Sequence, residues 1–292
     1  VTKNIKGVPA GSWVAQIQPS VYNAGEAFAT INNYRRDDWT PYLYHTTNFG
    51  KTWNRLVDGT DVPAYCLSFV QDPVVPELMF LGTEFGLYYS TDKGGKWNKW
   101  TNGYPSVSTM DMEIHPREHD LVLGTFGRSI WVLDDIRPLR EIAKAGQAAV
   151  EGKGLHLFEM PQAYIANLGE PNGYRSTGNG IFMGENRMQG ALMSVYVPEV
   201  KADSKEKLII KVINAASDTI RTLKSTPHKG INRLSWDLDQ KGFRLPSQEK
   251  LKEARERGGR GVLPGTYQVS ISYNGQTSQS AVNIVVNPAE AI

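Results

Sequence analysis

The hydrophobic residues of this chain are gathered in short runs, and Gly, Pro, Asn, Asp and Ser residues separate one run from the next. Short apolar runs bounded by turn-forming residues predict β-strands rather than helices. In the first half, the runs fall into three blocks that can be laid over one another. The runs are residues 13–17, 27–31, 42–45 and 52–56 in block one, 66–69, 78–83, 87–89 and 96–100 in block two, and 110–114, 121–125 and 129–133 in block three.

A turn pattern follows the third run in blocks one and two, as TTNFGKTW at residues 46–53 and STDKGGKW at residues 90–97. Asp92 can accept hydrogen bonds from the backbone N–H groups that follow it, and Gly94 can adopt the positive φ of a tight turn. Asn48 keeps this bonding without the charge, which favours a structural role over acid–base chemistry. The residues assigned to this structural role are Thr46, Asn48, Gly50, Trp53, Ser90, Asp92, Gly94 and Trp97.

The two tryptophans of these turns, Trp53 and Trp97, are 44 residues apart. Four antiparallel strands repeating every 40–45 residues or so are typical of β-propeller blades. Propellers close with about four to eight blades, whereas this chain contains three, and the third lacks an evident outer strand. We therefore expect the chain to be the carboxy-terminal portion of a larger protein. Its partners would be the remaining propeller blades, from the same parent protein or from another chain.

The second half predicts a different all-β domain. Residues 141–190 read as a linker, with modest helical character over 139–150 and a long polar loop over 167–190. Six or seven short strands follow within residues 191–292, which indicates a β-sandwich with Trp236 in its core. The dipeptide Asn274-Gly275 is a strong hairpin signal. Residues 248–260 form a charged insertion, for which we expect a solvated face that begins with one or two helical turns.

Composition narrows the class of protein further. The formal net charge of +2 is too small to favour nucleic acid as a partner. The single cysteine, Cys66, cannot form a disulfide within the chain and is expected in the core. No apolar run is long enough for a membrane span, and Val1 begins no signal-peptide pattern.

The turn patterns match the Asp-box, S/T-x-D/N-x-G-x-x-W, also called the BNR repeat. The blades resemble those of sortilin-type propellers and of bacterial proteins labelled BNR glycosyl hydrolases. Residues 123–136, LGTFGRSIWVLDDI, are similar to the closing blade of large secreted bacterial members. The segment 219–273, with GINRLSWD and PGTY, is similar to Ig-like domains of secreted bacterial proteins. The resemblance implies an all-β chain, with a partial β-propeller over residues 1–140 and an Ig-like β-sandwich over residues 191–292. It also implies a secreted, periplasmic or cell-surface location in a bacterium.

The sequence gives no complete catalytic site. A sialidase needs three arginines around one carboxylate, with a tyrosine nucleophile and a glutamate partner, and block-equivalent arginines are absent. His115 and His119 suggest a metal site. However, His115 aligns with Asp72 and Gln18 at the blade turn of the other blocks, which favours a structural role in the turn over metal binding. We assign no catalytic residue, no metal and no cofactor.

The favoured hypothesis is a binding or scaffold module whose propeller loops recognise a protein or a glycan. Aromatic and basic residues of the block-one insertion suit recognition. The candidate binding residues are Tyr34, Arg35, Arg36, Trp39 and Arg128. The alternative is a glycoside hydrolase whose catalytic residues are completed by the missing blades.

Overall fold

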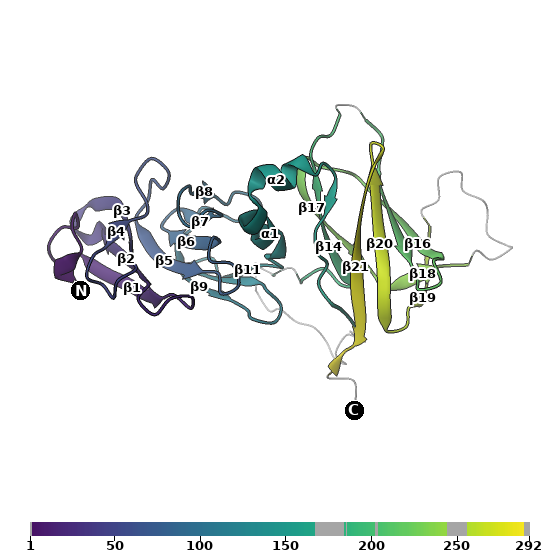
Figure 1. The fold of residues 1–292 in the computed structure, drawn as a ribbon, viewed down its shortest axis with the longest axis horizontal. Helices are drawn as coiled ribbons and strands as arrows, with labels where there is room; N and C mark the ends of the chain where they lie inside the picture. Colours follow the sequence, from purple (N-terminus) through teal and green to yellow (C-terminus); the bar gives the residue numbers. More distant parts are fainter. Residues whose placement is uncertain (1, 167–183, 185, 202–203, 244–255, 289–292) are drawn as a thin grey trace, which may run out of the picture. The chain divides into compact units, whose positions relative to one another are not determined.

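The computed structural model describes residues 2–166, 184, 186–201, 204–243 and 256–288. The chain divides into two compact units, Val1–Ala149 and Val150–Ile292 (Figure 1). Both are built almost entirely of antiparallel sheets, which confirms the predicted all-β class with a partial propeller and a β-sandwich.

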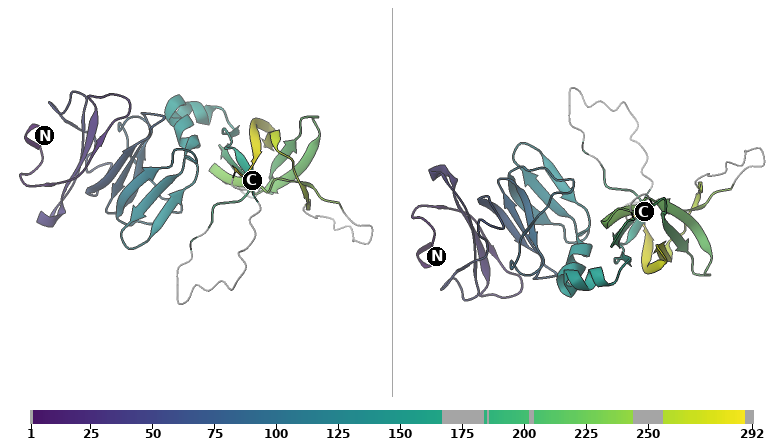
Figure 2. Two further views of the ribbon diagram at one scale, coloured as in Figure 1. Left: turned by 90° about the horizontal axis from the view of Figure 1, so that it is seen from below. Right: turned by 90° about the horizontal axis from the view of Figure 1, so that it is seen from above.

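The first unit contains three sheets, which follow one another along the unit in both views of Figure 2. Blade one has the order β1-β2-β3-β4, blade two has the order β5-β6-β7-β8, and blade three has three strands in the order β11-β10-β9. The missing outer strand of blade three therefore agrees with the sequence. The bounds are β1 (Trp13–Pro19), β2 (Ala27–Asn33), β3 (Asp38–Thr46), β4 (Asn54–Arg55), β5 (Cys66–Gln71), β6 (Met79–Thr83), β7 (Gly86–Ser90), β8 (Asn98–Lys99), β9 (Thr109–Ile114), β10 (Leu121–Thr125) and β11 (Ile130–Leu133), with 3-10 turns η1 (Thr2–Asn4) and η2 (Tyr34–Arg36).

The blades are held together by apolar side chains that meet face to face. Between blades one and two, Phe28 lies 4.6 Å from Phe69 by ring centroids, and Leu43 and Leu81 are completely buried in the same cluster. Cys66 is also buried there, as expected. Between blades two and three, Phe80 and Leu123 belong to a second cluster. The middle sheet, blade two, is therefore apolar on both faces, and a neighbouring blade covers each of them.

The structure corrects the alignment of the blade turns. The first hairpin of each blade closes through equivalent backbone bonds from Ser20 N–H to Glu26 C=O (3.0 Å), Asp72 N–H to Leu78 C=O (2.9 Å) and His115 N–H to Asp120 C=O (2.8 Å). The position equivalent to Asp72 and His115 is therefore Ser20, not Gln18. The sequence alignment matched the X-Pro pairs, but Pro19 ends β1, whereas Pro73 lies beyond β5. A proline is tolerated in β1 because β1 is an edge strand.

The two turn patterns make the same hydrogen bonds. Asp92 Oδ1 accepts from the Ser90 hydroxyl (2.7 Å) and the Lys96 N–H (2.9 Å), while Ser90 Oγ accepts from Gly94 N–H (2.9 Å). In blade one, Asn48 Oδ1 accepts from the Thr46 hydroxyl (3.1 Å) and the Thr52 N–H (2.9 Å). Gly50 and Gly94 have φ of 76° and 84°, which a side chain would strain.

The tryptophans of these turns lie at equivalent positions but differ in burial. Trp97 is 4% exposed and donates from Nε1 to the Leu56 carbonyl (3.1 Å), inside the cluster between blades one and two. Trp53 is half-buried and donates to the Gly50 carbonyl of its own turn (3.2 Å). Trp97 therefore joins two blades, while Trp53 packs on the face of blade one that lacks a neighbouring blade.

Trp97→Ala should lower the free energy of unfolding by about 3–5 kcal/mol, the usual cost of truncating a large buried aromatic side chain. Trp53→Ala should cost less, because its side chain is only half-buried. Urea denaturation followed by circular dichroism measures both. Equal losses for the two variants would contradict the assignment of Trp97 to an inter-blade core.

A short helix packs on blades two and three at the end that carries the β5–β6 and β9–β10 turns. Helix α1 (Arg137–Ala145) has Pro138 in its first turn, where the missing N–H costs nothing, and it buries Leu139 and Ala143 against the second inter-blade cluster. Helix α2 (Gln147–Gly152) follows. These helices agree with the helical character expected near residues 139–150.

Arg140 of α1 makes a buried ion pair. Its Nε lies 2.8 Å from Asp72 Oδ2, and both side chains are almost fully buried. Asp72 Oδ1 also accepts from the N–H groups of Val74 (2.8 Å) and Val75 (2.7 Å). Asp72 therefore orders a turn of blade two and anchors the helix at the same time.

Arg140→Ala should destabilise the protein by about 3–5 kcal/mol, because it leaves the Asp72 carboxylate buried without its partner. The double variant Arg140→Ala with Asp72→Asn should be more stable than Arg140→Ala alone, since Asn retains the turn acceptor without the charge. Thermal and urea unfolding test this. A double variant less stable than the single one would argue against an uncompensated charge as the cause.

The second unit is a β-sandwich with one core. One sheet has the order β12-β14-β17, the other has the order β13-β21-β20-β15-β16, and β18 pairs with β19. Trp236 is completely buried in the core, as predicted, and donates from Nε1 to the Asp239 carbonyl (2.8 Å). The bounds are β12 (His156–Leu157), β13 (Ala163–Ile165), β14 (Ala191–Val197), β15 (Leu208–Ile213), β16 (Thr219–Ser225), β17 (Gly230–Trp236), β18 (Asp239–Lys241), β19 (Gly258–Gly261), β20 (Gly265–Tyr273) and β21 (Gln276–Val286).

The structure tests the hairpin, linker and insertion that the sequence predicts in and beside this unit. Asn274 and Gly275 form the predicted hairpin turn between β20 and β21. In the segment expected as a linker, α1 joins the core of the first unit, whereas β12 and β13 pair with strands of the second. Most of the expected long loop and the expected helical turns of the charged insertion lie outside the described residues.

Candidate functional site

The antiparallel meander of each blade sends its turns to two opposite ends. The turns between the first and second strands and between the third and fourth strands lie at one end, and this end carries the residue 46–53 and 90–97 turns. The turns between the second and third strands, and the connections from one blade to the next, lie at the other end. The residues expected to bind a ligand, Tyr34, Arg35, Arg36, Trp39 and Arg128, all belong to this second end or to the strand start beside it.

Aromatic rings pack together where blade one meets blade two at this end. Tyr34 stacks on Tyr65 with ring centroids 4.6 Å apart, and Trp39 lies 5.4 Å from Tyr65. The Arg35 guanidinium lies over the rings of Tyr34 (4.9 Å) and Trp13 (5.7 Å). These contacts fix the cation between two rings, and cation–π pairs of this kind stabilise most when partly desolvated.

Hydrogen bonds extend the cluster across blades two and three. Glu84 Oε2 accepts from the Tyr65 hydroxyl (2.6 Å) and from the Ser108 hydroxyl (2.7 Å). The Ser108 carbonyl accepts from Phe126 N–H (3.0 Å) in the β10–β11 turn. Burial, reinforced by the hydrogen bond to Glu84 and its negative charge, raises the pKa of Tyr65 well above its usual range.

These contacts make one continuous feature, which we call the loop row. It comprises Trp13, Tyr34, Arg35, Trp39, Tyr65, Glu84, Ser108 and Phe126. Trp13 and Phe126, at its two ends, are 63% and 76% exposed, and Trp39 is 49% exposed. The loop row therefore presents aromatic surface to solvent along three successive blades, on a base fixed by buried contacts.

The other candidate binding residues lie apart from this row. Arg36 donates from Nη1 to the Ala10 carbonyl (2.6 Å), and its guanidinium lies against Gly11. Arg128 is exposed in the turn before β11, and its carbonyl accepts from Trp131 Nε1 (2.9 Å). Arg35 and Arg36 thus have different partners, and Arg128 lies two blades away.

Sequence reasoning missed Trp13, Tyr65, Glu84, Ser108 and Phe126. One signal could have found two of them. The repeats GTEFG at 82–86 and GTFG at 124–127 place Glu84 and Phe126 in equivalent turns, and the four-strand register puts those turns at the end that carries Tyr34. Ser108 and Tyr65 lie in irregular connections, where no periodicity marks their positions.

The histidines considered for metal binding have other partners. His115 Nδ1 accepts from Glu118 N–H (3.1 Å), and His119 Nδ1 lies 2.7 Å from Arg140 Nη1. Burial and the nearby positive charges of Arg140 and Arg137 lower the pKa of His119. Within the residues that the structure describes, no group of three or more His, Cys, Asp or Glu side chains is arranged to hold a metal ion.

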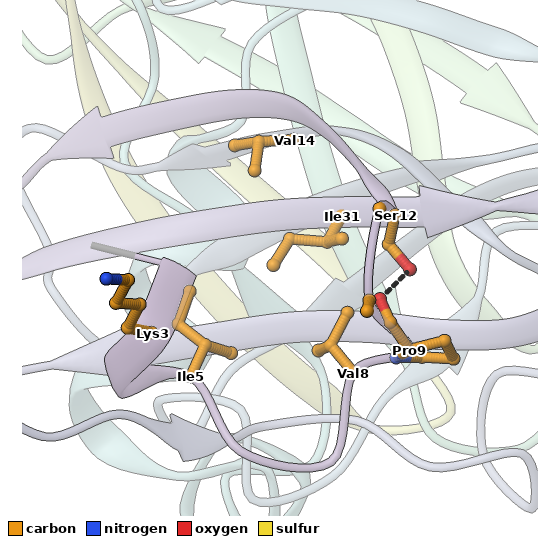
Figure 3. Close-up of a pocket in the computed structure, with 9 residues that line it drawn as sticks. Lys3, Ile5, Val8, Pro9, Ser12, Val14 and Ile31 are labelled. Atoms are coloured by element: carbon orange, nitrogen blue, oxygen red, sulfur yellow. Dashed lines mark hydrogen bonds between the residues drawn. The ribbon is translucent and has the colours of Figure 1, made fainter.

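A cavity of about 430 Å³ lies on blade one, between its sheet and the amino-terminal segment (Figure 3). Ile5 and Val8 of the segment face Val14 and Ile31 of the sheet, and Lys3 lies at the edge of this group. This wall is mainly apolar, which sets the cavity apart from the loop row.

Asp38 fixes the start of β3, next to the turn that carries Tyr34 and Arg35. Its Oδ2 accepts from Asn33 Nδ2 (3.1 Å) and the Tyr42 hydroxyl (2.9 Å), and its Oδ1 accepts from Thr40 N–H (3.1 Å). Burial alone would raise its pKa, but these hydrogen bonds outweigh burial and lower the pKa of Asp38 from 3.8 to about 2.

No protein-family model matches the chain, and no curated protein matches it. Among solved structures, a GH74 enzyme from Niastella koreensis is 18% identical with a TM-score of 0.36, covering 42% of this chain and 21% of that one. The extracellular domain of a protein described as a hybrid two-component system from B. thetaiotaomicron is 8% identical with a TM-score of 0.33, covering 94% and 32%. An ancestral GH74 enzyme is 13% identical with a TM-score of 0.27, covering 93% and 35%.

The chain therefore spans about a fifth to a third of the length of these structures. At such scores, no functional conclusion follows from the likeness. Among the residues that the structure describes, no helix is both long and apolar enough to cross a membrane.

The Asp38 carboxylate should contribute stability only while it is ionised. Because its pKa is lower in the folded state, this contribution is present above about pH 4 and is lost as pH falls toward the folded pKa of about 2. Asp38→Asn should therefore reduce stability at pH 6, and the difference from the unmodified protein should shrink as pH approaches 2. Urea unfolding at a series of pH values measures this, and a difference that does not change with pH would contradict it.

Proposed function

We propose that this protein is a secreted or cell-surface binding module that recognises a glycan through the loop row. The single observation that supports this proposal most is the continuous line of contacts from Trp13 through Tyr65 and Glu84 to Phe126. Aromatic side chains give a binding surface a large, rigid contact area at low entropic cost. The flat indoles of Trp13 and Trp39 suit the apolar faces of sugar rings.

Polar groups beside these rings suit the hydroxyl groups of a sugar. The Arg35 guanidinium carries several N–H donors, and the Glu84 carboxylate, whose Oε2 accepts from Tyr65 and Ser108, has Oε1 as a second acceptor oxygen. Asp37, between Arg35 and Trp39, accepts from Trp39 Nε1 (3.1 Å) and so holds the indole in place. Fixed rings with a few directed polar groups are the usual composition of a specific small-molecule surface.

The glycoside hydrolase alternative is less well supported. Glu84 Oε2 is already engaged by two hydroxyl donors, and Tyr65 is 5% exposed with a raised pKa, which is the opposite of an activated nucleophile. Hydrolysis would also need a second carboxylate about 5–10 Å from the first across the bond to be cleaved. These contacts favour binding over catalysis.

We further propose that the residue 46–53 and 90–97 turns are Asp-boxes with a structural role. The side-chain hydrogen bonds of Asn48 and Asp92 stay within each turn, and the turns lie at the end of the blades away from the loop row. The second unit would then be an Ig-like spacer or docking domain.

The proposal predicts that Trp13→Ala and Trp39→Ala each weaken glycan binding about tenfold or more, equivalent to about 1.4 kcal/mol. A panel of soluble neutral and acidic polysaccharides, screened by affinity electrophoresis and then by calorimetry, identifies the ligand class. Phe49→Ala is the matched control, because Phe49 is 77% exposed at the opposite end of the same blade. Binding that survives both tryptophan changes, or failure to bind any polysaccharide, would refute the proposal.

A further inference from the structure

Arg35 is the cation of the loop row, and aromatic rings hold it in place. Its guanidinium lies over the rings of Tyr34 (4.9 Å) and Trp13 (5.7 Å), and the side chain is exposed to solvent. Over the part of the chain that the structure describes, this guanidinium makes neither an ion pair nor a hydrogen bond. Its N–H groups are therefore available to a ligand.

The carboxylates nearest to Arg35 along the chain and in the loop row are engaged by other donors. Asp37 accepts from Trp39 Nε1 (3.1 Å), and Glu84 Oε2 accepts from two hydroxyl groups of the loop row. Asp38 accepts three hydrogen bonds from residues of β2 and β3. The charge of Arg35 is thus left to be paired by an anion from outside the chain.

The adjacent arginine is used differently. Arg36 donates from Nη1 to the Ala10 carbonyl (2.6 Å), and its guanidinium lies against Gly11. Arg36 therefore fixes the segment that leads into β1. One short turn, η2, holds a structural arginine next to an arginine whose donors face solvent.

The ring contacts suit Arg35 to the recognition of an anion. A guanidinium that lies over an aromatic ring keeps the N–H donors of its own plane, and these match two oxygens of a carboxylate or a sulfate. Tyr34 is itself stacked on Tyr65, with ring centroids 4.6 Å apart, so the cation lies on a fixed base. A side chain that is already ordered loses little conformational entropy when a ligand binds.

We propose that the glycan recognised by the loop row is anionic, and that Arg35 pairs with its carboxylate or sulfate group. This inference rests on the proposed function. A sugar ring can pack on an indole with its apolar face while an acidic substituent extends from the edge of the ring. Trp13 supplies such an indole in contact with Arg35. Carboxylate and sulfate share the required chemistry, and the experiment distinguishes them.

Binding of four polysaccharides by the whole chain, measured by affinity electrophoresis and calorimetry, tests the inference. Polygalacturonate carries carboxylates, and fully methyl-esterified pectin is its neutral counterpart. Dextran sulfate and dextran form the corresponding pair for the sulfate group. The unmodified protein should bind at least one anionic polymer about tenfold or more tightly than its neutral counterpart. The pair that shows this difference identifies the anionic group.

Three variants test the role of the guanidinium. Arg35→Gln should abolish the preference and lower the affinity for the anionic polymer about tenfold or more. Arg35→Lys keeps the charge without the paired N–H donors, so it should retain only part of the affinity. Arg36→Gln is the matched control, because it removes the same charge one residue away and should leave the preference in place. Thermal unfolding checks that each variant is folded.

Equal affinity for the charged and the neutral member of both pairs would overturn the inference and leave glycan binding itself intact. A preference that survives Arg35→Gln, or that Arg36→Gln removes equally, would also overturn it. Failure to bind any polysaccharide, including those of the wider panel, would refute the proposed function and this inference with it.

Discussion

The packing of one blade against the next is the interaction on which the first unit depends. A blade here is a sheet of three or four short strands, and its outer strands β4 and β8 have two residues each. Such a sheet cannot bury its apolar side chains by itself. The contact of Phe28 with Phe69, and the equivalent burial of Phe80 beside blade three, supply the apolar burial that keeps the sheets together.

The need of each blade for a neighbouring sheet also explains what is found on the faces of blades one and three that no other blade covers. Where a neighbouring blade is present, connections and helix α1 complete the core, and the buried Asp72–Arg140 pair fixes α1 to it. Where no neighbouring blade is present, apolar residues such as Ile17 and Ile130 remain exposed. The meander also separates two tasks, because it sends the hydrogen-bonded turns to one end of each blade and the loop row to the other.

Much of this fold could be predicted from sequence because its signals are local. Strand runs, the two tryptophan turns and the Asn274-Gly275 hairpin are set by residues close together in the chain, and the structure contains them. The alignment of Gln18 with Asp72 was wrong for a local reason too, since Pro19 is the last residue of a strand whereas Pro73 lies in a turn.

The loop row could be predicted only in part. Tyr34, Arg35 and Trp39 could be predicted because they form an aromatic and basic insertion in block one. The other members of the row come from three separate connections, at Tyr65, Glu84 and Ser108. Only the twist and spacing of the assembled blades bring these connections together. The cation–π contacts of Arg35 and the two hydrogen bonds to Glu84 depend on that assembly. No repeating pattern in the sequence predicts them.

The most direct test of this account is a double-mutant cycle on the contact between Phe28 and Phe69. The free energy of unfolding is measured for Phe28→Ala, Phe69→Ala and the double variant. Because the rings touch across the junction, the account predicts a coupling energy of about 0.5–1.5 kcal/mol beyond additivity. Strictly additive losses would show that the two blades are stabilised independently, and would contradict the claim that inter-blade packing holds the unit together.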